Sequence, residues 1–406
     1  MRWTTEQQEY RHALRRFVDA RVFPQRDALE HGGIPPYDIL REFYSSFGIG
    51  DAAIDRFERS MAGEQVRGER SAGETLIPMI ELSRCSPGLV TALGVSVNLA
   101  AGAILRAGSP AQKRRWVPPL LTLEAIGAWA ITEPDSGTDA FGSMRCTATP
   151  NGDGWLINGS KTFITNGPYA DTIVLICKAS AGASEERPAI LTFVLDRGMP
   201  GLTQTSSLRK MGLHSSPTGE LSLNEVAVGP DRLLSHHRRH DSSESSQEGS
   251  GSGSTREGSK TTFAHERASV AAMALGIIER CLELSVGHAR SRVQFGQPIG
   301  TFQLIQQKLA HMEVARLNVE NLVLGHIDLV DAGDPPSLTT ASAMKLYSAQ
   351  AAMQTALEAV QIFGGAGYMA ESHVEQLCRD AKVLQIYAGT DEIQITHVAR
   401  GLLGKL

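Results

Sequence analysis

The stretch Ala128-Trp-Ala-Ile-Thr-Glu-Pro-Asp-Ser-Gly-Thr-Asp139 marks the point at which the chain changes from helical to β-like sequence. Residues 127–132 have the composition of a strand, which ends in a turn rich in small and hydroxylated residues. Such a turn presents backbone N–H groups and hydroxyls to an anion or a polar heterocycle. Taken alone, however, the stretch indicates no more than a polar turn.

The sequence before this turn is helical. Residues 72–84 and 89–106 are rich in Ala, Leu and Met, and Ser109-Pro110 is a typical helix start, with a serine N-cap and a proline at the first helical position. A first helix is predicted near the N-terminus, where Thr5 and Gln8 form a candidate capping box. We therefore expect a helical N-terminal domain over residues 1–125.

The sequence after the turn consists of short β-like runs. Asn151-Gly-Asp-Gly154 and Asn158-Gly-Ser160 are predicted hairpin turns, because Asn and Gly tolerate the positive φ of tight connections. Short strands without intervening helices favour an antiparallel β-barrel or sandwich over a parallel sheet. A middle β domain is expected over residues 126–234.

The last part of the chain is helical again. Long helices are predicted at 267–290, 302–331 and 337–363, with shorter ones at 373–381 and 391–403, so residues 262–406 should form an antiparallel helical bundle. Residues 235–261, dominated by Ser, Gly and Glu, are expected to be a low-complexity flexible insertion. The predicted fold class is α+β, in the order α, β, α.

Composition excludes several classes of protein. A net charge of -5 with 42% hydrophobic residues gives no basic excess for nucleic-acid binding. The longest apolar run, 89–105, is interrupted by glycines, Ser96 and Asn98, so no membrane span is expected. Five scattered cysteines suggest free buried thiols and neither disulfides nor a metal site. The charged N-terminus is unlike a signal peptide, which favours a cytoplasmic location.

Two further motifs accompany the first. Phe163-Ile-Thr165-Asn-Gly167 ends a predicted strand in a hydroxyl, with an aromatic ring two residues earlier that could cover a flat ligand. Gln361-Ile-Phe-Gly-Gly-Ala-Gly-Tyr368 places glycines after a helix and not after a strand, so it is no dinucleotide fingerprint. By itself each motif has an ordinary structural explanation, a hairpin and a helix C-cap.

Together and in this order, the motifs resemble the acyl-CoA dehydrogenase family of flavoproteins. Residues 131–139 are similar to the family's first signature and residues 361–382 to its second, and the resemblance covers nearly the whole chain. It implies an FAD-dependent oxidoreductase that acts on the CH–CH group of an acyl-CoA. It also implies a homotetramer built as a dimer of dimers and an electron-transfer flavoprotein as electron acceptor.

The resemblance also implies where FAD binds. Four residues should touch the isoalloxazine ring or pyrophosphate, namely Trp129, Ile131, Thr132 and Thr138. Phe163, which replaces a tryptophan common in the family, and Thr165 should flank the ring and N5, and Thr390 and Glu392 should bind from the C-terminal domain. The adenosine half, in the neighbouring subunit, should be reached by Arg292, Phe295, Gln303, Gln361, Gly364 and Gly365.

The catalytic base is not where many family members have it. They carry a glutamate directly after the tyrosine of Ile386-Tyr-Ala-Gly-Thr390, where this chain has Ala388. Similarity to the isovaleryl-CoA and long-chain branches places the base at Glu266, and Arg267, Tyr387 and Ala388 are implied in substrate binding. Three alternatives stay open: an ordinary first-turn glutamate favoured by the helix dipole, a non-catalytic flavin-binding protein, and a dehydrogenase of carrier-protein-bound acyl groups.

Overall fold

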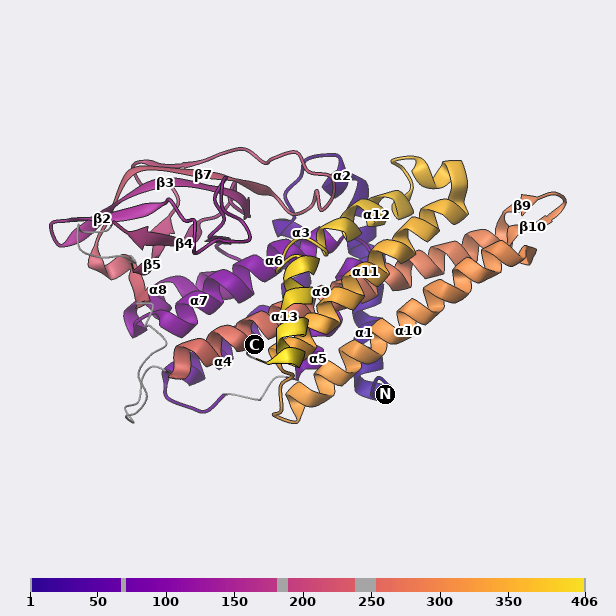
Figure 1. The fold of residues 1–406 in the computed structure, drawn as a ribbon, viewed down its shortest axis with the longest axis horizontal. Helices are drawn as coiled ribbons and strands as arrows, with labels where there is room; N and C mark the ends of the chain where they lie inside the picture. Colours follow the sequence, from indigo (N-terminus) through magenta and orange to yellow (C-terminus); the bar gives the residue numbers. More distant parts are fainter. Residues whose placement is uncertain (1, 67–70, 181–188, 238–252, 405–406) are drawn as a thin grey trace.

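The computed structural model describes residues 2–66, 71–180, 189–237 and 253–404, and its helical, β and helical parts follow one another along the chain (Figure 1). Helices occupy both ends of the sequence, and the strands of the middle part gather into one sheet that lies to one side of the helical bundle. The predicted α+β architecture is therefore confirmed.

The N-terminal part begins with α1 (Thr5–Phe17), whose capping box lies one residue earlier than predicted. The hydroxyl of Thr4 accepts a hydrogen bond from the N–H of Gln7, and the Gln7 side chain accepts one from the N–H of Thr4. The prediction of Thr5 and Gln8 was wrong because the extended backbone at Thr4 makes that residue the N-cap. The following elements are η1 (Val18–Val22), η2 (Phe23–Gln25), α2 (Arg26–Glu30), α3 (Tyr37–Ser46), α4 (Ile49–Met61), α5 (Ala72–Ser83), α6 (Pro87–Gly94), η3 (Val95–Ala100), α7 (Ala101–Ala107) and α8 (Pro110–Leu121).

The run α6–η3–α7 corrects the expectation about membrane spans. Over Pro87–Ala107 it is long and apolar enough to cross a bilayer, with a mean hydropathy of 1.8 in its best window, and it is the one such helix in the described part of the chain. Its glycines and polar residues do not lower the hydropathy enough to exclude it. Leu89, Val90 and Ile104 are nevertheless buried, and Ser96 accepts a hydrogen bond from Gly127 N at 2.8 Å. These contacts are typical of a core helix.

The middle part is a mixed sheet, not a purely antiparallel one. Its strands are β1 (Gly127–Ala130), β2 (Thr147–Asn151), β3 (Gly154–Thr165), β4 (Thr172–Ala179), β5 (Ile190–Asp196), β6 (Leu202–Gln204), β7 (Thr218–Val228) and, after η4 (Pro230–Arg232), β8 (Leu233–His237). The order is β6-β7-β3-β2-β4-β5-β8, with β1 beside β4, and both β1 and β2 run parallel to β4. The sequence predicted the strands but not these two parallel pairings.

One of the two predicted hairpin turns is present. Asn151 and Gly154 face each other at the end of the antiparallel pair β2–β3. Asn158-Gly-Ser160, in contrast, lies inside β3 as a bulge against β7. The strand stays continuous there because Asn158 pairs with Thr147 on one side and Gly159 with Leu223 on the other.

The C-terminal part is a bundle of long helices. Its elements are α9 (Gly253–Ser291), β9 (Val293–Gln294), β10 (Gln297–Pro298), η5 (Ile299–Thr301), α10 (Gln303–Asp331), α11 (Leu338–Phe363), η6 (Gly364–Tyr368), α12 (His373–Val383) and α13 (Asp391–Leu403). Helix α9 starts well before the predicted 267, and β8 reaches His237, so both ends of the expected 235–261 insertion are regular structure. Its centre, 238–252, lies outside the described residues.

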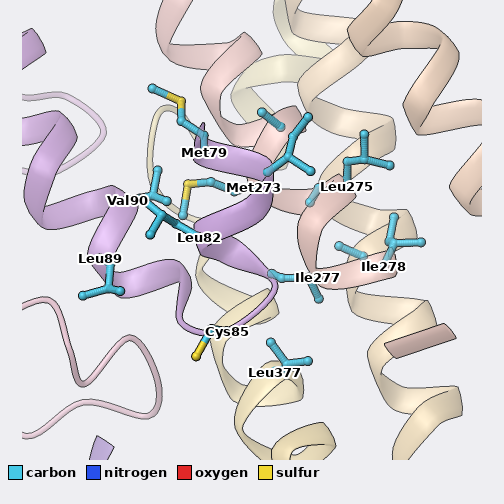
Figure 2. Close-up of a cluster of buried hydrophobic side chains, with 14 of the residues drawn as sticks. Met79, Leu82, Cys85, Leu89, Val90, Met273, Leu275, Ile277, Ile278 and Leu377 are labelled. Atoms are coloured by element: carbon cyan, nitrogen blue, oxygen red, sulfur yellow. The ribbon is translucent and has the colours of Figure 1, made fainter. Parts of the chain in front are cut away.

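The largest hydrophobic core joins the two helical parts. Met79, Leu82 and Leu89 of α5 and α6 pack with Met273 and Ile277 of α9 (Figure 2). A Cβ on Gly276 would lie 2.3 Å from the carbonyl oxygen of Ile80, so glycine permits the close crossing of α5 and α9. Four of the five cysteines are buried, and all five are free thiols, as predicted. The core residues of helix α9 extend from Ala268 to Ala289, so this part of the helix is fixed by packing.

Candidate functional site

The loop between α12 and α13 contains a turn of unusual backbone conformation. Ala388 and Gly389 have φ values of 53° and 83°, and the first of these is rare for a residue with a side chain. The amide nitrogen Nε2 of Gln394 donates to the carbonyl oxygens of Ala388 at 3.0 Å and of Gly389 at 2.9 Å. In the described residues, no group accepts a hydrogen bond from the backbone N–H of Ala388 or from that of Gly389. The turn therefore offers two backbone donors to a ligand.

This turn packs against the face of α9 that carries Glu266. The hydroxyl of Tyr387 donates to Sδ of Met273 at 3.2 Å, and Met273 lies seven residues, or about two turns, along α9 from Glu266, hence on the same face. Burial raises the pKa of Tyr387, a hydrogen bond from Thr91 of α6 opposes that rise, and the negative charge of Glu266 adds to it. The base predicted from sequence and the Tyr387–Gly389 turn thus lie together.

Glu266 is a partly buried carboxylate in the interior of α9. Burial raises its pKa, and the positive charges of Arg267 and Lys345 oppose the rise. The helix begins more than three turns earlier, at Gly253, so the interpretation of Glu266 as a first-turn residue was wrong. A carboxylate whose charged form is disfavoured by burial, and which lies near the Tyr387–Gly389 turn, is suited to take up a proton.

Arg267 and Lys345 are held by partners that the sequence did not indicate. Nη2 of the buried Arg267 lies 3.0 Å from Nδ1 of His397. Because the guanidinium can only donate, this ring nitrogen must accept, which fits a His397 pKa that burial and the nearby arginines lower. Lys345 is fully buried, and its Nζ lies 3.3 Å from Oδ1 of Asp391, the first residue of α13. Asp391 also accepts hydrogen bonds from Gln350 and Gln385.

The candidate flavin residues of the middle part form one surface. The segment after β1 is joined to β3, because Thr162 N donates to Thr132 O at 3.0 Å and Lys161 Nζ donates to Ile131 O at 2.9 Å. Phe163 has a φ of 57° and is 67% exposed, so its ring stands out from the sheet. The half-buried Trp129 and Thr165 come from the same two strands, and Thr138 is exposed in the adjoining turn.

A buried ion pair supports this surface from below. Lys161 Nζ lies 2.8 Å from Oε1 of Glu133, and the carboxylate also accepts the N–H groups of Arg145 and Cys146. Burial alone would raise the pKa of Glu133, but these hydrogen bonds lower it. The exposed aromatic ring of Phe163, the threonine hydroxyls and the buried ion pair beneath them together form a surface that fits a flat heterocycle with polar edges.

The other candidate flavin residues lie elsewhere. Thr390 caps α13, accepting from Ile393 N at 3.4 Å, and Glu392 follows in its first turn, beside the Tyr387–Gly389 turn. A third set lies at the tip of the bundle around β9–β10, on the side away from the sheet, where Phe295 is 93% exposed (Figure 1). That set consists of Arg292, Phe295, Gln303, Gln361, Gly364 and Gly365. One chain does not bring it to the surface around Phe163.

Two hollows in the described residues add little to the site. The larger, of about 310 Å³ between α10 and α11, holds none of the predicted site residues. A smaller cavity of about 40 Å³ lies between α3, α4, α5 and the α6–η3 run, with a mostly apolar wall that includes Val90, Leu93 and Gly94. This second cavity adjoins Thr91, the α6 residue that hydrogen-bonds with Tyr387.

Comparison with known families agrees with this arrangement. The models of the acyl-CoA dehydrogenase N-terminal, middle and C-terminal domains match residues 4–124, 128–226 and 257–403. The chain belongs to the acyl-CoA dehydrogenase family. An acyl-CoA dehydrogenase of Bacillus subtilis (strain 168) is 35% identical over 100% of both chains. A mitochondrial isovaleryl-CoA dehydrogenase of Oryza sativa subsp. japonica is 32% identical over 98% of this chain and 91% of the relative.

Solved structures of acyl-CoA dehydrogenases superpose on nearly the whole chain. Butyryl-CoA dehydrogenase from Megasphaera elsdenii matches with a TM-score of 0.83 and 33% identity over 99% of both chains. The prolyl acyl carrier protein oxidase AnaB matches with a TM-score of 0.83 and 28% identity over 100% of both chains. The similar chains are thus oxidoreductases that differ in the carrier of their substrate.

Sequence reasoning about this acyl-CoA dehydrogenase found Glu266 and the turn but missed what holds them. Lys345, Asp391, His397 and Gln394 carried no motif of their own. For Gln394, its position four residues after the N-cap Thr390 is the one signal that it could fold back onto the turn. For a buried lysine in the middle of α11, the sequence offers no signal beyond a charge among small residues.

Proposed function

We propose that this protein catalyses the FAD-dependent α,β-dehydrogenation of an acyl-CoA thioester with Glu266 as the base. The observation that carries the proposal is the position of Glu266, whose pKa burial raises, on the α9 face that packs against the Tyr387–Gly389 turn. The carboxylate takes the α proton, while the N–H groups of this turn, above all that of Ala388, stabilise the charge that develops on the thioester oxygen.

FAD fits the surface formed by Trp129, Phe163 and Thr165. When bound, it accepts the hydride that leaves the β carbon of the substrate. Phe163 would cover one face of the flavin ring, and the hydroxyls of Thr132, Thr138 and Thr165 would hydrogen-bond with its polar groups, as Thr390 and Glu392 would from α13. Arg267 and Tyr387 would border the substrate, where the half-buried aromatic ring of Tyr387 would help to exclude water.

The proposed assembly is a homotetramer, and the separation of the two sets of flavin residues supports a contribution from a neighbouring subunit. Arg292, Phe295 and Gln303 lie at the end of the bundle away from the sheet, so they would serve the flavin of a neighbouring subunit. An electron-transfer flavoprotein is the proposed electron acceptor. The five free thiols fit a cytoplasmic location, where thiols stay reduced.

A dehydrogenase of acyl groups bound to a carrier protein is the second candidate. It is favoured by the match to AnaB, whose substrate is attached to an acyl carrier protein. A non-catalytic flavin-binding protein, suggested by Ala388, is the third. The buried and partly unpaired polar groups around Glu266 argue against it, because a protein without catalysis gains nothing from their cost.

The deciding experiment is anaerobic mixing of the purified, FAD-loaded protein with a panel of CoA thioesters, followed by flavin absorbance. Bleaching by the wild type and by Glu283→Gln, a control at an exposed glutamate on the same helix, but not by Glu266→Gln, supports the proposal. Equal bleaching by Glu266→Gln would exclude Glu266 as the base. Bleaching only by thioesters of a carrier protein would favour the second candidate, and bleaching by neither kind of thioester the third.

A further inference from the structure

We propose that Gln394 is a positioning residue that aims the backbone donors of the Tyr387–Gly389 turn at the thioester carbonyl. This inference rests on the proposed function and concerns the same site. Gln394 is fully buried, and its Nε2 lies 3.0 Å from the carbonyl oxygen of Ala388 and 2.9 Å from that of Gly389. One side-chain amide therefore restrains two consecutive peptide groups.

Peptide planarity converts this restraint into a direction for the N–H groups. In a trans peptide the C=O and the N–H point in opposite directions, so a carbonyl of Ala388 that faces Gln394 turns the N–H of Gly389 away from it. The φ of 53° at Ala388 in turn sets the orientation of the N–H of Ala388 relative to the peptide plane between Ala388 and Gly389. The described residues provide no acceptor for either N–H. Both donors are left for a ligand.

The position of Gln394 is fixed by the helix that carries it. Its own N–H donates to the carbonyl of Thr390 at 3.0 Å, and the hydroxyl of Thr390 caps the same turn of α13. Asp391, at the start of the helix, is tied to Lys345 of α11 and to Gln350. The side chain thus reaches back over an anchored helix end, and a Cβ on Gly389 would lie 2.5 Å from its Nε2.

The polar atoms of Gln394 show that this contact is not explained by stability alone. Its Oε1 is buried and has no hydrogen-bond partner in the described residues, which is unfavourable for the folded state. Exchanging O and N in the amide would set an oxygen against two carbonyl oxygens, so the orientation is determined by the turn. The left-handed backbone of Ala388, with a φ of 53°, is strained for a residue with a Cβ. Such costs are typical of a geometry that is kept for function.

The test measures the acidity of a bound substrate analogue. A 3-thiaacyl-CoA can lose its α proton but cannot be dehydrogenated, so on the FAD-loaded protein its anion gives a long-wavelength charge-transfer band. The variants are Gln394→Met, which removes the donor, and Gln394→Glu, which keeps the shape. The control is Gln385→Met, which removes a hydrogen bond to Asp391 without touching the carbonyls of the turn.

We expect both Gln394 variants to bind the analogue but to ionise it at least tenfold less readily, so that the band appears about one pH unit higher or more. With a true substrate, kcat should fall about tenfold to a hundredfold while KM changes little, because the lost alignment matters most for the transition state. Gln385→Met should match the wild type. If Gln394→Met does not fold, the Gln394→Glu variant provides the test.

Ionisation of the analogue by either folded Gln394 variant at the wild-type pH would overturn the role of Gln394. An equal shift in Gln385→Met would also overturn it, since the effect would then come from the helix end in general. A wild-type protein that gives no band with any analogue would contradict the proposed function itself, and the two failures are therefore distinguishable.

Discussion

Glu81, which packs against helix α9, and Glu266, which belongs to it, have pKa values shifted in opposite directions. Near the middle of this helix, Glu81 of α5 and Glu279 of α9 share three arginines, with Arg11 Nε 2.8 Å from Glu81 Oε1 and Arg11 Nη2 2.7 Å from Glu279 Oε2. Burial alone would raise the pKa of Glu81, but Arg15, Arg11 and Arg84 lower it. Glu266 has no ion pair within the described part of the chain, and burial raises its pKa.

The difference separates a carboxylate that holds the fold from one that is available for chemistry. The arginine cluster joins α1, α5 and α9, so the charge of Glu81 stabilises the packing of the N-terminal helices against the bundle. Glu266 keeps its proton affinity because no arginine side chain in the described residues forms an ion pair with it. Substitutions at the two positions should therefore affect different properties.

Glu266→Gln should have the largest effect, on catalysis. Removal of a general base typically lowers the rate by about 10²–10⁴-fold, so flavin reduction by a productive thioester should slow by that factor. Rapid-mixing absorbance at saturating substrate measures it. A loss below tenfold would mean that Glu266 and Glu81 do not differ in chemical role.

Glu81→Gln should have the next largest effect, on stability. Removing one partner of a buried ion pair typically costs about 3–5 kcal/mol, because the arginines are left uncompensated. Since the pKa of Glu81 is lowered, its contribution is present above the ordinary glutamate pKa and is lost as pH falls through the folded value. Denaturant unfolding at pH 7 and at a series of pH values below the ordinary glutamate pKa should show a difference from wild type that shrinks as the pH falls.

Glu266→Gln should in turn stabilise the protein near neutral pH, by about 1–2 kcal/mol or less. The pKa of Glu266 is raised, so ionisation of Glu266 destabilises the folded state as the pH rises from the ordinary glutamate pKa to the folded pKa. Glutamine does not ionise and so avoids this loss of stability. Below the ordinary glutamate pKa both proteins should unfold alike. A variant less stable than wild type at pH 7 would show that Glu266 also has a structural partner.

Asp38→Asn provides the smallest expected effect. Its pair with Arg41, 2.9 Å apart on α3, is largely exposed, and such pairs contribute about 0–1 kcal/mol. Thermal unfolding should place this variant within a degree or two of the wild type. A large loss would mean that the comparison of α9 carboxylates reflects ion pairing in general and not burial.

The order of the parts and most of the helices could be predicted because hydrophobic periodicity and helix start and stop signals are properties of the local sequence. Ser109-Pro110 begins α8 as expected, and the ends of α10, α11 and α13 agree within a residue. The parallel pairing of β1 and β2 with β4 could not be predicted, since it depends on contacts distant in sequence. The bulge at Asn158-Gly-Ser160 was misjudged for the same reason, because only the partner strands distinguish it from a turn.

The site was predictable only as far as motifs reached. Glu266 was found through an absence at Ala388, but its environment depends on Lys345 of α11, which no local pattern connects with α9. The extension of α9 back to Gly253 was missed because Ser and Gly have weak helix propensity. What the residues of the site do for one another is decided by tertiary packing.

Strand β3, which carries Phe163, lies far from the β9–β10 end of the bundle, which carries Phe295, and this separation has a consequence for handling the protein (Figure 1). Under the proposed assembly, each flavin bridges two chains, so its retention becomes a matter of mass action between subunits. Dilution should then release the chromophore before any helix unfolds, and the yellow colour of a preparation would report its degree of association.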